Sequence, residues 1–278
     1  MNDEHRKKYE NFCQLHKADA AFVIPNAWDG GSARILTHLG FSALATTSAG
    51  FAFSLGVRDS SHALGREAVL ENASAIAQAT HLPVSGDLEE GFGKDPETCA
   101  ETIRLAAATG LVGGSIEDAT GDPDNAIYGL GLAVDRIAAS AEAARDKGFL
   151  LTARAENYLW GKADLKDTIR RLQSYSEAGA DVLYAPGLPD LDAIRTVCAA
   201  VDRPVNVVMG LSGPASSVEE LQQAGVRRIS VGGSFARAAI GAMIRAAEEV
   251  RDKGTFNYAC DAVPDRVVAQ MMSDQKRP

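Results

Sequence analysis

The sequence contains few cysteines, and none of them lie close together. Cys13, Cys99, Cys198 and Cys260 are spread over 278 residues without a CxxC pair. This spacing argues against a disulfide framework and is typical of thiols in a reducing compartment. We therefore expect a cytoplasmic protein.

A long apolar run and an excess of basic residues are also missing. No apolar stretch approaches the roughly 20 residues that a membrane-spanning helix needs. Residues 1–12, MNDEHRKKYENF, lack the apolar segment of a secretory signal. The formal net charge is −9, with acids and bases interspersed. These absences argue against a membrane or a nucleic acid as partner.

Common catalytic and cofactor motifs are absent as well. No GxSxG nucleophile elbow occurs, and no GxGxxG opens the first predicted strand–helix unit. The five histidines lie in predicted helices or loops without the spacing of zinc ligands.

The sequence does contain a repeated alternation of short apolar runs and amphipathic stretches. The β-rich runs are 21–28, 42–50, 82–89, 111–118, 149–156, 180–187, 204–210 and 227–233. The predicted helices are 30–39, 66–80, 96–109, 132–147, 164–178, 188–201, 215–224 and 234–252. Eight such units predict one α/β domain with a parallel sheet, closed into a (β/α)8 TIM-type barrel. An open doubly wound sheet is the alternative.

The predicted domain covers the whole chain, 1–278, because no linker or shift in composition divides it. Asp95-Pro96 and Ser216–Glu219 are predicted helix starts. Glycines predicted to end helices are Gly40, Gly110, Gly148, Gly179 and Gly225. We expect 253–278 to be a C-terminal extension, with a helix at about 263–272, that packs on the barrel or on a partner subunit.

Polar side chains gather where the predicted strands end, which is where such barrels carry their active sites. They are Thr46, Thr47 and Ser48 at the end of the second run, Asp87 and Glu89 at the end of the third, Glu117 and Asp118 at the end of the fourth, Arg154 and Glu156 at the end of the fifth, and Asn206 within the seventh. Carboxylates at the ends of central strands must be hydrated, paired or bound to a metal. An all-carboxylate set predicts Mg²⁺ or Mn²⁺ as cofactor.

Arg154 brings the opposite charge to this cluster. Its forked guanidinium suits a bidentate contact with a substrate carboxylate. An internal salt bridge to Glu117 or Glu156 is a second interpretation, and the two are compatible. A cation and an arginine on opposite sides of a 2-oxo acid would stabilise its enolate. Backbone N–H groups around Thr47 and Ser48 are candidates for further donors.

Several motifs in order resemble the isocitrate lyase/phosphoenolpyruvate mutase superfamily over almost the full chain. DLEEGFG at 87–93 is similar to the family's acidic metal segment, SIEDATG at 115–121 to its IED segment, and ARAENYLWG at 153–161 to its ARxEA segment. Further matching stretches are 25–34, 44–59 and 226–233.

The resemblance implies a barrel whose last helix is swapped between subunits, in dimers that pair into tetramers. It implies Mg²⁺ held mainly through water, with Asp87 as the first candidate for a direct ligand. The implied metal-binding residues are Asp59, Asp87, Glu89 and Glu117. The substrate's carboxylate and oxo group would lie against Thr47, Ser48 and Arg154. Family reactions make or break a C–C or P–C bond beside a 2-oxo acid, through an enolpyruvate-like intermediate.

The loop at 118–131, DATGDPDNAIYGLG, departs from the family pattern. Isocitrate and methylisocitrate lyases carry a KxCGH-type loop whose cysteine is the proton donor, and phosphoenolpyruvate mutases carry a lysine and an asparagine. This loop has no Cys, Lys or His, and Pro123 and Asn125 stand near the places of the mutase pair. We expect 119–131 to act as a lid. Asp59, Tyr128 and a metal-bound water are the open candidates for proton transfer.

Together these observations predict an enzyme: a Mg²⁺-dependent carbon–carbon lyase or decarboxylase for a small 2-oxo or 2-hydroxy carboxylic acid. The predicted catalytic residues are Arg154, Asp59 and Glu117. The predicted substrate-binding residues are Thr47, Ser48, Arg154 and Asn206. One alternative is a P–C bond enzyme such as a phosphonopyruvate hydrolase or mutase, against which the missing lysine counts. The other is a barrel that binds a 2-oxo acid without turnover. We expect a homo-oligomer, either dimer or tetramer.

Overall fold

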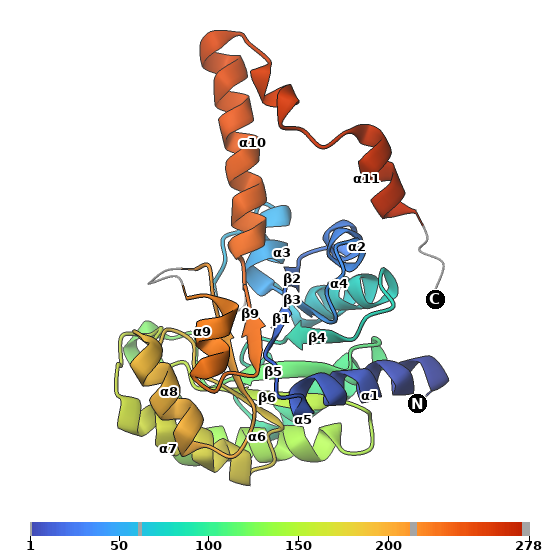
Figure 1. Ribbon diagram of the computed structural model, residues 1–278. Coiled ribbons are helices and arrows are strands. Elements are labelled where there is room, and N and C mark those ends of the chain that lie inside the picture. Colours follow the sequence, from blue (N-terminus) through green and yellow to red (C-terminus); the bar gives the residue numbers. More distant parts are fainter. Residues whose placement is uncertain (1, 61–62, 212–215, 274–278) are drawn as a thin grey trace.

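The computed structural model describes residues 2–60, 63–211 and 216–273, and it is a barrel of parallel strands surrounded by helices (Figure 1). Phe22–Ile24 (β1) and Asn26–Ala27 (β2) are two parts of one strand, interrupted at Pro25. β1 pairs with the last strand and β2 with the next strand along the chain. This divided strand joins the two ends of the sheet, so the predicted TIM-type fold is confirmed.

The other strands all lie within the predicted runs. They are Leu44–Thr46 (β3), Val84–Asp87 (β4), Gly113–Glu117 (β5), Leu150–Arg154 (β6), Val182–Tyr184 (β7), Val205–Val208 (β8) and Arg228–Ser230 (β9). The sheet order β1-β9-β8-β7-β6-β5-β4-β3-β2 follows the chain around the barrel. The parallel register places Glu117 opposite Arg154, and Arg154 opposite Tyr184. Neighbouring strand ends therefore bring acids and an arginine to one edge.

The predicted helices are present with ends shifted by a few residues. They are Gly30–His38 (α2), Arg66–Gln78 (α4), Pro96–Ala108 (α5), Leu130–Ala144 (α6), Leu165–Glu177 (α7), Leu191–Ala200 (α8), Val218–Gln223 (α9) and Ser234–Lys253 (α10). The first residue predicted for α9, 215, lies outside the described residues. α9 begins after Ser217, whose hydroxyl accepts from Glu220 N while the Glu220 carboxylate accepts from Ser217 N. The five predicted helix-ending glycines have φ between +66° and +105°.

Two helices were not predicted, Asp3–Lys17 (α1) and Ser48–Ser54 (α3). α1 packs its fully buried Phe12 against Ile24, Val112 and Leu150, near the amino-terminal ends of the strands. It therefore contributes to the apolar core at the end of the barrel opposite the strand-end acids. The sequence around the start of α3 still resembles a strand. The helix begins there because the Thr47 side chain caps it, accepting from Gly50 N at 3.3 Å.

The C-terminal segment leaves the barrel along α10, which protrudes as a long arm in Figure 1. Asp265–Met272 (α11) lies within the predicted 263–272 and contacts α2, where Arg34 Nη1 donates to Met272 O at 2.9 Å. Residues 274–278 of the predicted extension lie outside the described residues. Packing on a partner subunit and the helix swap stay predictions. Among the described helices, none is both long and apolar enough to cross a bilayer.

Candidate active site

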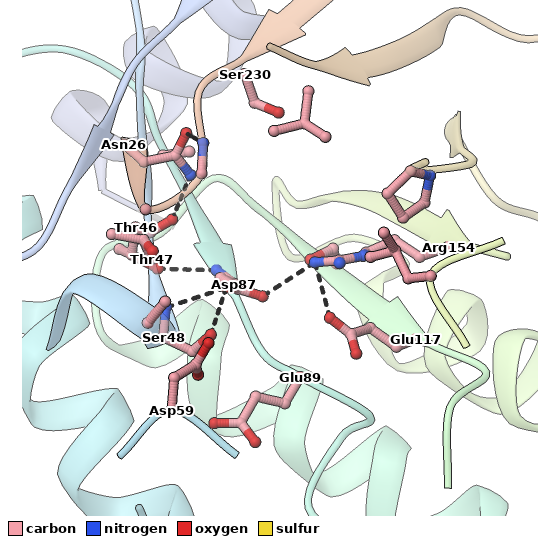
Figure 2. Close-up of a pocket in the computed structure, with 18 of the residues that line it drawn as sticks. Asn26, Thr46, Thr47, Ser48, Asp59, Asp87, Glu89, Glu117, Arg154 and Ser230 are labelled. Carbon is pink, nitrogen blue, oxygen red and sulfur yellow. Dashed lines mark hydrogen bonds and ion pairs between the residues drawn. The ribbon is translucent and has the colours of Figure 1, made fainter. Parts of the chain in front are cut away.

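A cavity of about 840 Å³ opens at the carboxyl ends of the strands. The eight residues predicted to be catalytic, substrate-binding or metal-binding all line it: Thr47, Ser48, Asp59, Asp87, Glu89, Glu117, Arg154 and Asn206. Most of them are labelled in Figure 2, where Asp87 lies between Ser48 on one side and Arg154 on the other. The strand ends therefore bring these side chains together, as parallel strands of one barrel must.

Arg154 is the cationic centre of the cluster. Its Nη1 lies 2.8 Å from Glu117 Oε1 and 3.3 Å from Asp87 Oδ1, and its Nε donates to Glu156 Oε1 at 2.8 Å. The guanidinium also lies over the ring of Tyr184, 4.7 Å from its centroid. Burial by itself would lower the pKa of Arg154, but Glu117 and Glu156 outweigh it and raise that pKa. The expected internal salt bridge is present with both acids, and the guanidinium stays charged.

Asp87 is held by the segment after β3. Its Oδ2 accepts from the backbone N of Ser48 at 3.0 Å and from the Ser48 hydroxyl at 2.9 Å. The backbone N of Asp87 donates to Thr46 Oγ1 at 2.8 Å. Because one carboxylate oxygen faces Ser48 and the other Arg154, the Asp87 carboxylate is fixed in one orientation.

The remaining acids lie beside Asp87. Glu89 has a left-handed backbone with φ of +49°, and Asp59 comes from the exposed segment after α3 (Figure 2). Burial raises the pKa of Glu117, and the neighbouring Glu156 and Asp87 raise it further while Arg154 lowers it. Burial and then Asp87 raise the pKa of Asp59. The cluster therefore gathers more negative charge than Arg154 alone compensates.

This donor set fits a hydrated divalent cation. Within the described residues, no group of three or more His, Cys, Asp or Glu side chains comes close enough together to hold a metal by direct ligation alone. Mg²⁺ keeps several of its waters and needs only one or two protein carboxylates directly. Burial is the main cause of the raised pKa values of Glu117 and Asp59, and neighbouring carboxylates raise both further. A bound cation would neutralise that second contribution.

The sequence of the chain is similar to those of known enzymes that belong to one family. Residues 12–251 match the family model for phosphoenolpyruvate phosphomutase. The chain belongs to the phosphoenolpyruvate mutase family. It is 32% identical over 243 residues to an uncharacterized protein of Mycobacterium tuberculosis, covering 87% of this chain and 89% of that protein. It is 30% identical over 210 residues to a 2-methylisocitrate lyase of Escherichia coli, covering 71% and 69% respectively.

A solved structure from Burkholderia cenocepacia J2315, classed provisionally as a lyase or mutase, is 55% identical to the chain. It superposes with a TM-score of 0.94, covering 97% of this chain and 96% of that one. The chain is thus an enzyme of the isocitrate lyase/phosphoenolpyruvate mutase type, whose relatives include lyases.

Two further acids support the site in this family member. The sequence named both at strand ends, Glu156 only as a salt-bridge partner of Arg154 and Asp118 without a role. Glu156 is 2% exposed and accepts from Arg154, while its backbone N donates to Asp118 Oδ1 at 2.8 Å. Asp118 accepts from the Tyr175 hydroxyl at 2.6 Å and from Arg171 Nη1 at 3.1 Å. Asp118 therefore positions Glu156, which in turn positions Arg154.

Asn26 was missed, although an asparagine within an apolar run signals a specific hydrogen-bonding task. Its Oδ1 accepts from the backbone N of Val231 at 3.0 Å and of Gly232 at 2.8 Å. Its Nδ2 donates to Thr46 O at 2.6 Å (Figure 2). One side chain thus links the segments after β9 and β3 across the divided first strand.

The loop between β5 and α6 folds back on itself. Thr120 N donates to Ala126 O at 2.9 Å, and Tyr128 N donates to Asp118 O at 2.8 Å. Ala119 and part of this loop line the cavity, but Tyr128 does not. Its ring packs beneath Arg136, 4.3 Å from the guanidinium carbon. This placement does not favour Tyr128 for proton transfer, and both that role and closure of 119–131 as a lid stay predictions.

Proposed function

We propose that the protein is a Mg²⁺- or Mn²⁺-dependent lyase or decarboxylase. It would break a carbon–carbon bond next to the oxo or hydroxyl carbon of a small carboxylic acid, through an enolpyruvate-like intermediate. The observation that carries this proposal is Arg154, held at the rim of an open cavity by Glu117, Asp87 and Glu156. An immobilised guanidinium beside an excess of carboxylates suits an anionic substrate bound together with a cation.

In this proposal Arg154 binds the substrate carboxylate. Its Nη1 and Nε contact protein acids, whereas its Nη2 makes no hydrogen bond to the described residues. The Nη2 donors therefore remain for the substrate. Thr47 Oγ1 accepts from Gly50 N, so its hydroxyl proton is directed to a second substrate oxygen. Asn206 lines the deeper wall, where Nδ2 donates to Ser230 Oγ at 3.1 Å.

The acids divide into three proposed roles. Asp87, Glu89 and Glu117 would hold the cation, which when bound supplies electrostatic stabilisation of an enolate oxygen. Asp59 is exposed at the cavity and has a raised pKa, so its carboxyl group is the proposed holder of the transferred proton. Glu156 and Asp118 keep Arg154 in place.

Phosphoryl chemistry is the second candidate, and the loop 118–131 favours it less, although Arg58, Arg154, Arg228 and Arg237 line the cavity. A transferring phosphoryl group needs cationic partners, yet the loop 118–131 contains no lysine, arginine or histidine. The described cavity lining also lacks lysine. Cleavage of a carbon–carbon bond beside a 2-oxo group has no such requirement, since it needs only stabilisation of an enolate.

The test is a substrate panel with purified protein and Mg²⁺. Oxaloacetate, 2-methylisocitrate, 2,3-dimethylmalate and phosphonopyruvate are assayed for released 2-oxo acid, with free phosphate measured in parallel. We expect 2-oxo acid without phosphate, and loss of turnover in Arg154→Met but not in the exposed-surface control Arg145→Met. Phosphate release from phosphonopyruvate would replace this proposal with the second candidate. No turnover of any of the four substrates, while Mg²⁺ still binds, would point to a substrate outside this panel or to the non-catalytic barrel.

A further inference from the structure

A second buried arginine lies deeper in the cavity than Arg154. Arg228 belongs to β9 and is 5% exposed, yet it lines the same cavity. Its Nε donates to Asn206 Oδ1 at 2.8 Å, and its Nη2 donates to Thr152 Oγ1 at 3.0 Å. Its Nη1 faces His16 Nε2 at 3.5 Å. The guanidinium therefore lies inside the barrel, between the strand-end acids and helix α1.

The contacts of Arg228 contain no counter-charge. Arg154 and Arg171 each pair with carboxylates. The buried Arg136 donates to three backbone carbonyls, those of Glu90, Gly93 and Lys94. Within the described part of the chain, Arg228 contacts only a neutral amide, a hydroxyl and an imidazole. An uncompensated buried cation is costly, and burial accordingly lowers the pKa of Arg228 to about 10. A guanidinium has five N–H donors, of which three are used here, so two remain.

The wall beside Arg228 is made of small polar residues. Ser85, Ser115 and Ser230 line the cavity and are each at most 8% exposed. Interiors of such barrels are usually filled by bulky branched side chains. Serines at these positions leave room for a ligand of a few atoms. The Ser230 hydroxyl already donates to Val207 O at 3.3 Å, so Ser85 and Ser115 carry the remaining hydroxyl donors of this wall.

We propose that Arg228 holds a compact anion at the floor of the cavity, of the carboxylate or halide class, separate from the group bound by Arg154. The anion has two possible sources, a second carboxylate of the bound acid or a free halide ion. This site does not depend on the reaction proposed above, because an anion would neutralise Arg228 whether or not the enzyme turns over.

The test is thermal unfolding in sodium chloride against sodium gluconate at equal ionic strength, with disodium malonate as the dicarboxylate probe. For an anion that binds the folded protein, each tenfold increase of its free concentration above its Kd should raise Tm by about 3 °C. Wild type and the matched control Arg227→Gln should both show the rise, and Arg228→Gln should lose it. A rise in chloride identifies the free ion, and one in malonate alone identifies the substrate carboxylate. Equal responses of wild type and Arg228→Gln in every salt would overturn the proposal.

Wild-type crystals soaked in sodium bromide keep the proposal testable where Arg228→Gln fails to fold. We expect an anomalous peak within hydrogen-bond distance of an Arg228 Nη atom. Bromide sites elsewhere only, together with no salt-specific change in wild-type Tm, would refute the site.

Discussion

Acidification should destabilise the protein through His16, a residue on α1 far from the acids of the active site. His16 is 7% exposed, and its ring packs edge-on against Phe12 and Phe22, with centroids 4.6 and 5.0 Å away. Its Nδ1 lies 2.8 Å from Phe12 O, so Nδ1 carries the proton and donates it. The unprotonated Nε2 faces the Arg228 guanidinium at 3.5 Å. A second proton on this ring would be buried beside a cation.

The size of the effect follows from the two pKa values of His16. Burial first and Arg228 second lower its pKa from 6.5 to about 3 in the folded protein, despite the opposing Phe12 carbonyl. Below pH 6.5 His16 binds a second proton in the unfolded chain but not in the folded protein. The free energy of unfolding is therefore unaffected by this group above pH 6.5 and declines as the pH falls toward 3. At pH 5 the loss is about 2 kcal/mol, since each pH unit below the unfolded pKa costs about 1.4 kcal/mol.

Urea unfolding at fixed protein concentration, from pH 7.5 to pH 5, measures this loss. The variant His16→Gln cannot titrate, and the other ionisable groups are the same in both proteins. The free-energy difference between wild type and His16→Gln should therefore change by about 2 kcal/mol across this range, with the wild type losing more. Parallel curves for the two proteins, or an NMR titration that puts the His16 pKa near 6, would refute the reasoning.

Three further predictions concern the site and the segment that follows β4. Arg154→Lys should lower kcat/KM at least about 100-fold, because an ammonium cannot replace the forked contacts; rescue to wild-type rates would contradict this role. Chelation with EDTA should abolish turnover and Mn²⁺ should restore it, and Asp87→Asn should raise the half-saturating Mg²⁺ concentration at least about tenfold by activity titration. Gly91→Ala should be less stable by chemical unfolding than the control Gly56→Ala by about 1–2 kcal/mol. Both glycines have positive φ, but only at Gly91 would a Cβ meet Cys99 Sγ, at 2.8 Å. Equal losses would disprove the steric argument.

The barrel fold and the position of the candidate site at its strand ends could be predicted from the sequence, because both follow from periodic patterns. Apolar runs separated by amphipathic helices predict parallel strands, and parallel strands end at one edge. Asp87, Glu117 and Arg154 therefore met as expected. Acids that line the mouth of the barrel can be recognised in the sequence, because they stand at the ends of buried apolar runs.

The misses have local physical causes. α3 was read as strand because its cap, Thr47, follows β-prone residues without a break, and α1 carries few apolar residues to reveal its buried face. Arg228 escaped notice because β9 is only three residues long, too short for its alternation to fix which side chains point inward. The sequence also could not place Tyr128, because its ring packs against Arg136 of the following helix rather than facing the strand-end acids.

Asn26 gives the closure of this barrel an unusual origin. Pro25 breaks the first strand, and a proline contributes no N–H to a ladder. At this seam the Asn26 amide takes over part of the joining, accepting from Val231 and Gly232 and donating to Thr46. One side chain therefore ties the end of β3 to the segment after β9, beside the backbone pairing of β1 with β9 and of β2 with β3. Loss of the Asn26 amide would leave the backbone N–H groups of Val231 and Gly232 without this acceptor, while the other strands keep their pairing.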